Sequence, residues 1–193
     1  MRVVSYPEAA TPPELRVQVL ALQHEAWPPE DSAAVSETAL THDPSLDPLS
    51  MLLMDNEIVV AALDVLTKEL VHAGRRYRAG GLSTVVTRRG ARGQGHGHRL
   101  VTAAREAMAA SGLDLGLFTC DRPLQAFYER AGWLLLPGTV IIGGTRRSPF
   151  RSDQPGFDKV TLGAFFSARA RTHRRDFHDS RIELYPGEID KLW

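Results

Sequence analysis

A glycine-rich turn between a predicted strand and a predicted helix is the feature that most constrains this fold. The segment 80–87 (GGLSTVVT) is rich in β-branched residues, which is typical of a buried strand. After a short basic link, the segment 95–110 carries apolar residues at the spacing of one helix face. The turn consists of Arg92, Gly93, Gln94, Gly95, His96 and Gly97, and His98 follows it.

This turn has the chemistry of a phosphate-binding loop. Glycines let the backbone approach a ligand closely, and a helix start presents unpaired amide N–H groups with partial positive charge. Together they predict a cradle for a pyrophosphate, with Arg88, Arg89 and Arg92 adding positive charge. Two other interpretations are a plain solvated basic loop and a dinucleotide site, although the glycine spacing does not match G-x-G-x-x-G.

The rest of the pattern predicts an α/β (α+β) protein with a mixed sheet and flanking helices. A helix is expected over 15–26, because prolines follow Trp27. The strand–helix–strand unit at 80–120 predicts a right-handed crossover between parallel strands. The other expected elements are a short helix near 33–40, a hairpin of 50–54 and 58–66, with 68–77 as its extension or a loop, a strand at 113–120, a helix at 123–131, core strands at 133–136 and 139–142, a loop at 146–155, a strand at 158–163, a basic polar stretch at 168–181 and a final strand at 182–185.

Two motifs resemble those of the GCN5-related N-acetyltransferase (GNAT) superfamily. The pattern R-x-x-G-x-G, at Arg92, Gly95 and Gly97, is similar to its coenzyme A motif. The segment 121–133 (DRPLQAFYERAGW) resembles its second signature, F-Y-E-x-x-G-aromatic. The resemblance implies a single N-acetyltransferase domain over 1–193 whose central twisted sheet contains a splayed parallel pair. Its parts would be a core at 50–142, an acceptor-side segment at 27–49 and an extension at 145–193.

The same resemblance implies acetyl-coenzyme A as co-substrate, with pantetheine between the splayed strands. An N–H of Val86 or its neighbour would donate to the thioester carbonyl oxygen. The residues expected to bind the coenzyme are Val85, Val86, Thr87, Arg92, Gly93, Gln94, Gly95, His96, Gly97, His98, Asp121 and Phe127.

Acyl transfer to an amine needs a proton donor for the leaving thiolate. Tyr128 has the position of the superfamily's acid, although it could also be a packed aromatic. The predicted strand 80–86 lacks the glutamate that several relatives use as a base. Ser83 could hold a water, Asp64 could supply a carboxylate, or the amine could lose its proton to water directly.

Acidic residues predict a cationic acceptor. Glu30, Asp31, Asp43 and Asp64 would attract an amine, unless the acids of 27–49 only solvate a loop. The closing Trp193 adds a resemblance to aminoglycoside 2'-N-acetyltransferases, in which a terminal carboxylate reaches the aminosugar. The alternative is that its indole only packs the tail onto the core.

The composition narrows the partners. Lys plus Arg and Asp plus Glu are 23 each, which gives no case for nucleic acid or a membrane surface. The N-terminal sequence lacks a signal-peptide pattern, so a cytoplasmic location is expected. Apart from a weak pair at His96 and His98, the seven histidines show no metal-ligand spacing, and no metal is expected. The sequence therefore predicts an N-acetyltransferase for a small amine, with a homodimer allowed. The alternatives are a non-catalytic acyl-coenzyme A sensor and a protein lysine or N-terminal acetyltransferase.

Overall fold

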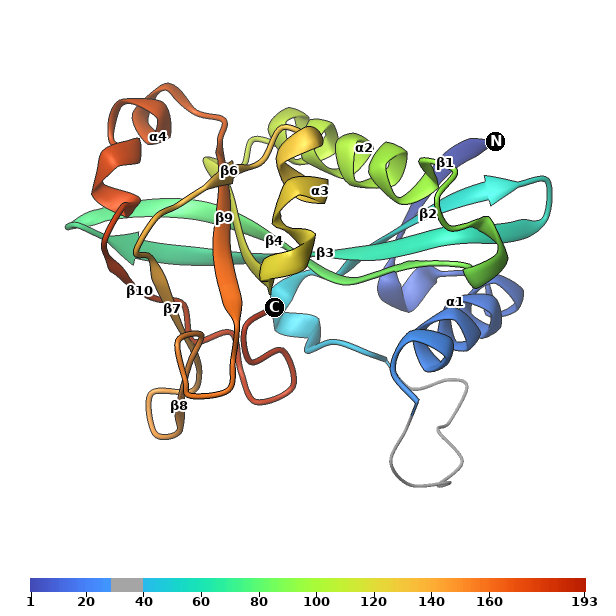
Figure 1. Cartoon of the computed structure of the whole chain (residues 1–193), viewed down its shortest axis with the longest axis horizontal. Helices are drawn as coiled ribbons and strands as arrows, with labels where there is room; N and C mark the ends of the chain where they lie inside the picture. The colour runs from blue at the N-terminus through green and yellow to red at the C-terminus, as the bar shows by residue number, and fades with distance from the viewer. Residues whose placement is uncertain (29–39) are drawn as a thin grey trace.

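A seven-stranded mixed sheet forms the centre of the protein in the computed structural model, which describes residues 1–28 and 40–193 (Figure 1). Its strand order is β1-β2-β3-β4-β5-β9-β6, and a three-stranded sheet has the order β10-β7-β8. The strands are β1 (Arg2–Pro7), β2 (Leu49–Asp55), β3 (Ile58–His72), β4 (Arg75–Thr87), β5 (Leu115–Asp121), β6 (Leu134–Leu135), β7 (Val140–Gly144), β8 (Pro149–Arg151), β9 (Lys159–Phe165) and β10 (Arg181–Glu183).

Helices cover both faces of the large sheet. The α-helices are α1 (Pro13–Ala26), α2 (His96–Ala110), α3 (Gln125–Arg130) and α4 (Ala168–Thr172), and the 3₁₀ turns are η1 (Glu8–Ala10), η2 (Pro44–Leu46), η3 (Arg89–Ala91), η4 (Arg122–Leu124) and η5 (Arg174–Phe177). Alternate residues of β2 and β3 pack on opposite sides, as a pleated strand requires. Leu53 and Leu63 join the core under α2, whereas Leu52 and Ala62 join the core under α1. Figure 1 shows α1 and α2 on opposite sides of β3 and β4.

The parallel strands β4 and β5 stay together over a very short distance. Among the residues that the structure describes, they pair only at Ala79–Leu115 and Gly80–Gly116. Beyond these pairs β4 continues along β3 and β5 continues along β9, so the two parallel strands separate. The predicted splayed parallel pair is therefore present.

Two tryptophans pack directly on glycines of these strands. A Cβ on Gly81 would lie 2.6 Å from ring carbons Cγ and Cδ2 of Trp193, and a Cβ on Gly116 would lie 2.6 Å from Cζ3 of Trp133. Only glycine permits such a close approach to the backbone. The indole of Trp193 therefore lies against β4 at the point where β4 leaves β5.

Most of the predicted elements are confirmed, and several details are wrong. Of the two alternatives for 68–77, the hairpin extension is confirmed, because this segment continues the β3–β4 hairpin. The predicted core strand at 139–142 is β7 of the small sheet, because its partners come from 149–151 and 181–183, far along the chain. The predicted loop at 146–155 contains β8, the basic stretch at 168–181 contains α4 and η5, and edge strand β1 has no counterpart in the predicted order. The helix expected near 33–40 lies almost wholly outside the described residues.

We expect Gly116→Ala to destabilise the protein by about 1–3 kcal/mol, because the new methyl group would overlap the buried ring of Trp133. The matched control is Gly90→Ala, since a Cβ there meets no atom within 4 Å. Its free energy of unfolding should stay within about 1 kcal/mol of the wild type. Urea titrations compare the three proteins, and equal midpoints for the two variants would contradict the proposed overlap.

Candidate functional site

A groove with a volume of about 700 Å³ lies between the end of β4, the turn before α2, and α3. In the described part of the chain it is lined by Ala26, Val85, Val86, Thr87, Ala91, Arg92, Gly93, Gly95, His96, Gly97, His98, Leu124, Phe127, Tyr128 and Arg130. A concave site of this size suits a small-molecule ligand. Most of the residues expected to bind the coenzyme therefore lie together in one groove.

The glycine turn gives the groove an anion-binding end. Gly93 and Gly95 have φ angles of 77° and 80°, in the left-handed region that favours glycine. Gly95 is the N-cap of α2, and no side chain caps the helix. The first N–H groups of α2 can therefore donate hydrogen bonds to a ligand. A Cβ on Gly97 would lie 2.9 Å from Oγ1 of Thr87, which explains the third glycine.

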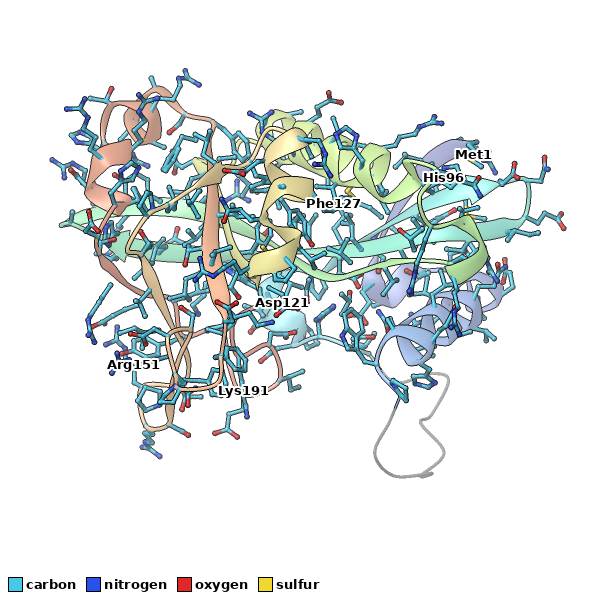
Figure 2. The ribbon with its side chains drawn as sticks, in the orientation of Figure 1. Met1, His96, Asp121, Phe127, Arg151 and Lys191 are labelled. Atoms are coloured by element: carbon cyan, nitrogen blue, oxygen red, sulfur yellow. The ribbon has the colours of Figure 1, made fainter. Side chains whose placement is uncertain are left out.

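Basic and polar side chains surround this end. The Nε of Arg92 donates to the carbonyl oxygen of Thr87 over 3.0 Å, which holds the turn against β4. The Nε2 of His98 lies 3.1 Å from the carbonyl oxygen of Arg130 and must donate, because a carbonyl only accepts. Figure 2 shows His96 near the start of α2 and Phe127 on α3. The ring of Phe127 would lie 3.5 Å from a Cβ on Gly97, so α3 closes the groove over the turn.

Tyr128 lies on the α3 wall of the groove. Its ring packs edge-to-face on Phe118 and Phe127, with centroids 4.9 Å apart in both pairs. Burial raises the pKa of the Tyr128 phenol well above its ordinary value, and the neighbouring side chains of Cys120 and Asp121 add to the increase. The hydroxyl is therefore protonated at neutral pH and can donate a proton.

A bulge shapes the opposite wall of the groove. Asp64 pairs with Ser83 and Ala62 pairs with Val86, so Thr84 and Val85 together face one residue of β3. Thr84 has a φ of 47°, a conformation that is costly for a β-branched residue. The bulge turns the segment Val85–Thr87 along the groove after β4 has left β5.

Comparison with known proteins identifies the family. The family model described as an acetyltransferase (GNAT) domain matches residues 10–136, about two thirds of the chain. The chain belongs to the GNAT acetyltransferase family. It is therefore an acyltransferase of a fold that binds acetyl-coenzyme A.

Solved structures agree with this GNAT fold. An acyl-CoA N-acyltransferase from Pseudomonas aeruginosa is 20% identical, with a TM-score of 0.55 over 84% of this chain and 97% of that one. Escherichia coli ElaA is 15% identical, with a TM-score of 0.56 over 84% and 99%. An aminoglycoside 6'-N-acetyltransferase complexed with coenzyme A is 14% identical, with a TM-score of 0.59 over 88% and 99%. The sequence matches no curated protein.

The remaining predicted residues of this GNAT protein lie in different places. Gln94 and Asp121 are outside the residues that line the groove where the chain is described, and Asp121 pairs with Lys159 over 2.7 Å between Oδ1 and Nζ. Asp43 caps η2 by accepting from the N–H of Ser45 over 2.9 Å. That bond and the hydroxyl of Ser45 lower its pKa. Glu30 and Asp31 lie outside the described residues.

Asp64 belongs to a buried cluster that the sequence patterns do not reveal. The Nδ1 of His42 lies 2.5 Å from Oδ1 of Asp190, and its Nε2 lies 3.2 Å from Oδ2 of Asp64. Burial alone would lower the pKa of His42, but hydrogen bonds and charges from both carboxylates outweigh it and raise this pKa to about 10. His42 is therefore an imidazolium at neutral pH. No spacing signal could have found the cluster, because its members come from three distant segments.

Metal-ligand groups and membrane-spanning helices are both absent from the described residues. Residues 1–28 and 40–193 contain no group of three or more His, Cys, Asp or Glu side chains arranged to hold a metal ion. Within the same residues, no helix has both the length and the apolar character needed to span a membrane.

We expect wild-type stability to fall more steeply than that of His42→Gln as pH rises from 6.5 to 10. The folded protein keeps the His42 proton up to a pKa of about 10, against an ordinary value of 6.5. The stabilisation is therefore complete below pH 6.5 and is lost as pH rises, by at most ~1.4 kcal/mol per pH unit. Urea unfolding at several pH values measures the slopes, and parallel profiles for the two proteins would disprove a raised pKa.

Proposed function

We propose that the protein transfers the acetyl group of acetyl-coenzyme A to the primary amine of a small cationic acceptor. One observation carries this proposal: a single groove joins the uncapped start of α2 to the protonated hydroxyl of Tyr128. The first binds phosphate and the second can protonate a thiolate. Both ends of the coenzyme therefore have suitable groups within one continuous space.

The coenzyme would lie along the groove with its pyrophosphate over Gly93–Gly97. The free N–H groups of the α2 start would bind it, and Arg92 and Arg130 would add positive charge. Pantetheine would run beside Val85–Thr87, because the separation of β4 from β5 leaves room for an extended chain. An N–H at or near Val86 would donate to the thioester carbonyl oxygen, where negative charge develops during attack.

In the transfer step, the amine nitrogen attacks the thioester carbon directly. The C–N bond forms, the C–S bond breaks, and its electron pair passes to sulfur, which takes the proton of Tyr128. The acylated nitrogen then gives its extra proton to water, and a proton from water restores the Tyr128 hydroxyl. The amine must lose a proton first. Strand β4 offers no carboxylate for this, so water is the simplest acceptor, and Ser83, the strand partner of Asp64, would hold that water.

Negative charge on the α1 side of the sheet supports a cationic acceptor. The carboxylates of Asp43, Asp64 and Asp190 lie there around the positive ring of His42, which balances only one of these three negative charges, and Glu8 is buried nearby with its Oε2 lacking a hydrogen-bond partner among the described residues. Coulomb attraction would draw an ammonium group towards this side. Aminoglycosides carry several such groups, and one structural neighbour is named for acting on them. They are therefore the first acceptors to test.

A turnover screen tests the proposal. Purified protein, acetyl-coenzyme A and a panel of aminoglycosides, polyamines, amino acids and peptides are combined, and free thiol is measured. Release with one small-amine class supports the proposal. Tight coenzyme binding without thiol release in the presence of any amine would instead indicate a sensor. Thiol release with peptides alone would indicate a protein acetyltransferase.

We expect Tyr128→Phe to lower kcat by about 10²–10⁴-fold, because the thiolate loses its proton donor. Coenzyme affinity should change little, since the ring and its packing remain. Tyr77→Phe is the matched control, because Tyr77 is equally buried in another part of the core. An unchanged kcat in Tyr128→Phe would remove the proposed acid.

Gly97→Val should weaken coenzyme A binding by about tenfold or more, because its side chain would collide with Thr87 at the phosphate end. Calorimetry with coenzyme A measures the affinity. The control, Gly90→Val, enters open space beside the same turn and should bind as the wild type does. Equal affinities for the two variants would place the pyrophosphate elsewhere.

A further inference from the structure

Three buried charged side chains meet beside the bulge of β4. His42 precedes η2, Asp64 lies on β3, and Asp190 follows β10. The side chains of His42 and Asp64 are 1% and 5% exposed, and that of Asp190 is 5% exposed. Both ring nitrogens of His42 face a carboxylate: Nδ1 is hydrogen-bonded to Asp190, and Nε2 makes a charge contact with Asp64 over 3.2 Å without hydrogen-bond geometry. While the ring is protonated, neither nitrogen can accept a proton from a substrate.

Asp64 connects this triad to the groove wall. Its Oδ2 accepts from Oγ1 of Thr84 over 2.6 Å, and its Oδ1 accepts from Oγ of Ser50 over 2.5 Å. Thr84 is the residue with left-handed φ in the bulge. A residue keeps such a conformation only where its surroundings hold it, and this hydrogen bond is a direct means of doing so. The orientation of Asp64 therefore bears on the path of Val85–Thr87.

Asp190 connects the triad to the segment Asp190–Trp193. Its Oδ2 accepts from the N–H of Asp43 over 3.1 Å, and its carbonyl oxygen accepts from the N–H of Trp193 over 3.1 Å. The carbonyl oxygen of Lys191 accepts from the N–H of Gly144 over 2.9 Å, which ties this segment to the small sheet. These contacts place the indole of Trp193 on Gly81.

We propose that His42 is a positioning residue whose ring ties the segment Asp190–Trp193 to the Thr84 bulge, so that the groove wall Val85–Thr87 is held in place only when this segment is docked. The proposal deepens the proposed function and rests on it for the identity of the groove. Removing the positive ring leaves two buried carboxylates without compensation, which is strongly unfavourable. The Thr84 bulge and the segment Asp190–Trp193 should then loosen together, because His42 links the aspartate that holds one to the aspartate of the other.

Amide hydrogen exchange tests this coupling in the whole protein. In His42→Gln, exchange should rise by about tenfold or more both in the peptide containing 82–88 and in the peptide containing 186–193. Exchange in α2 should stay as in the wild type. His72→Gln is the matched control, because Nε2 of His72 donates to the carbonyl oxygen of Asp176 over 2.7 Å, far from the bulge. It should loosen η5 and leave both test peptides unchanged.

A second variant separates positioning from general damage. In His42→Gln/Asp190→Asn one of the two uncompensated carboxylates is gone, so protection of both peptides should largely return. Loosening of 186–193 alone would overturn the proposal, since the triad would then be only an anchor for that segment. Loosening of every peptide, or no recovery in the double variant, would also overturn it by showing a loss of the fold.

Binding and turnover distinguish this proposal from the proposed function. The coenzyme A affinity of His42→Gln should fall less than its rate of thiol release, because the pyrophosphate would bind at the start of α2, where exchange stays as in the wild type, and only the pantetheine wall Val85–Thr87 loosens. Thiol release from acetyl-coenzyme A with the pooled amine panel should fall by about tenfold or more and recover in the double variant. An unchanged rate in His42→Gln would overturn the positioning role. If the wild type neither binds coenzyme A nor releases thiol, the proposed function fails, and the exchange data still decide whether the two segments are coupled.

Discussion

The early separation of β4 from β5 is the constraint on which the rest of this structure depends. After Gly80 and Gly116 the two strands no longer pair, so the inner edge of β4 loses its neighbour in the sheet. Backbone amides at such an edge need other partners. An extended ligand with amide groups can supply them, which is the character of pantetheine. The groove thus lies where the strand pairing of the sheet stops, and a ligand could pair with β4 there.

The fold surrounds this opening with groups of opposite charge. Basic side chains and free helix amides lie at the α2 end, where phosphates would bind, and buried carboxylates lie on the α1 side. Because salt screens charges over about 8–10 Å, each end mainly affects the part of a ligand next to it. Coenzyme and acceptor can therefore be attracted to neighbouring places without competing for the same groups.

Local patterns predict a large part of this arrangement. The glycine turn, α2 and the position of Tyr128 follow from short segments in which strand, turn and helix signals are adjacent. The cluster of His42, Asp64 and Asp190 could not be predicted in this way, because His42 and Asp190 are 148 residues apart and meet only in the folded chain. The prediction that 139–142 belongs to the core sheet is wrong for the same reason, since β7 lies in the second sheet. The residues of β7 indicate a strand, but they do not indicate which distant strands pair with it.

The contact between His42 and Asp190 also has a consequence for biosynthesis. Domains begin to fold while the chain is still emerging from the ribosome, starting from the N-terminal side. The hairpin of β3 and β4 and the helix α2 can form well before residue 190 appears. The contact of His42 with Asp190 cannot form until residue 190 has left the exit tunnel. The Thr84 bulge therefore emerges without its link through Asp64 and His42 to Asp190, and it gains that link only when residue 190 follows.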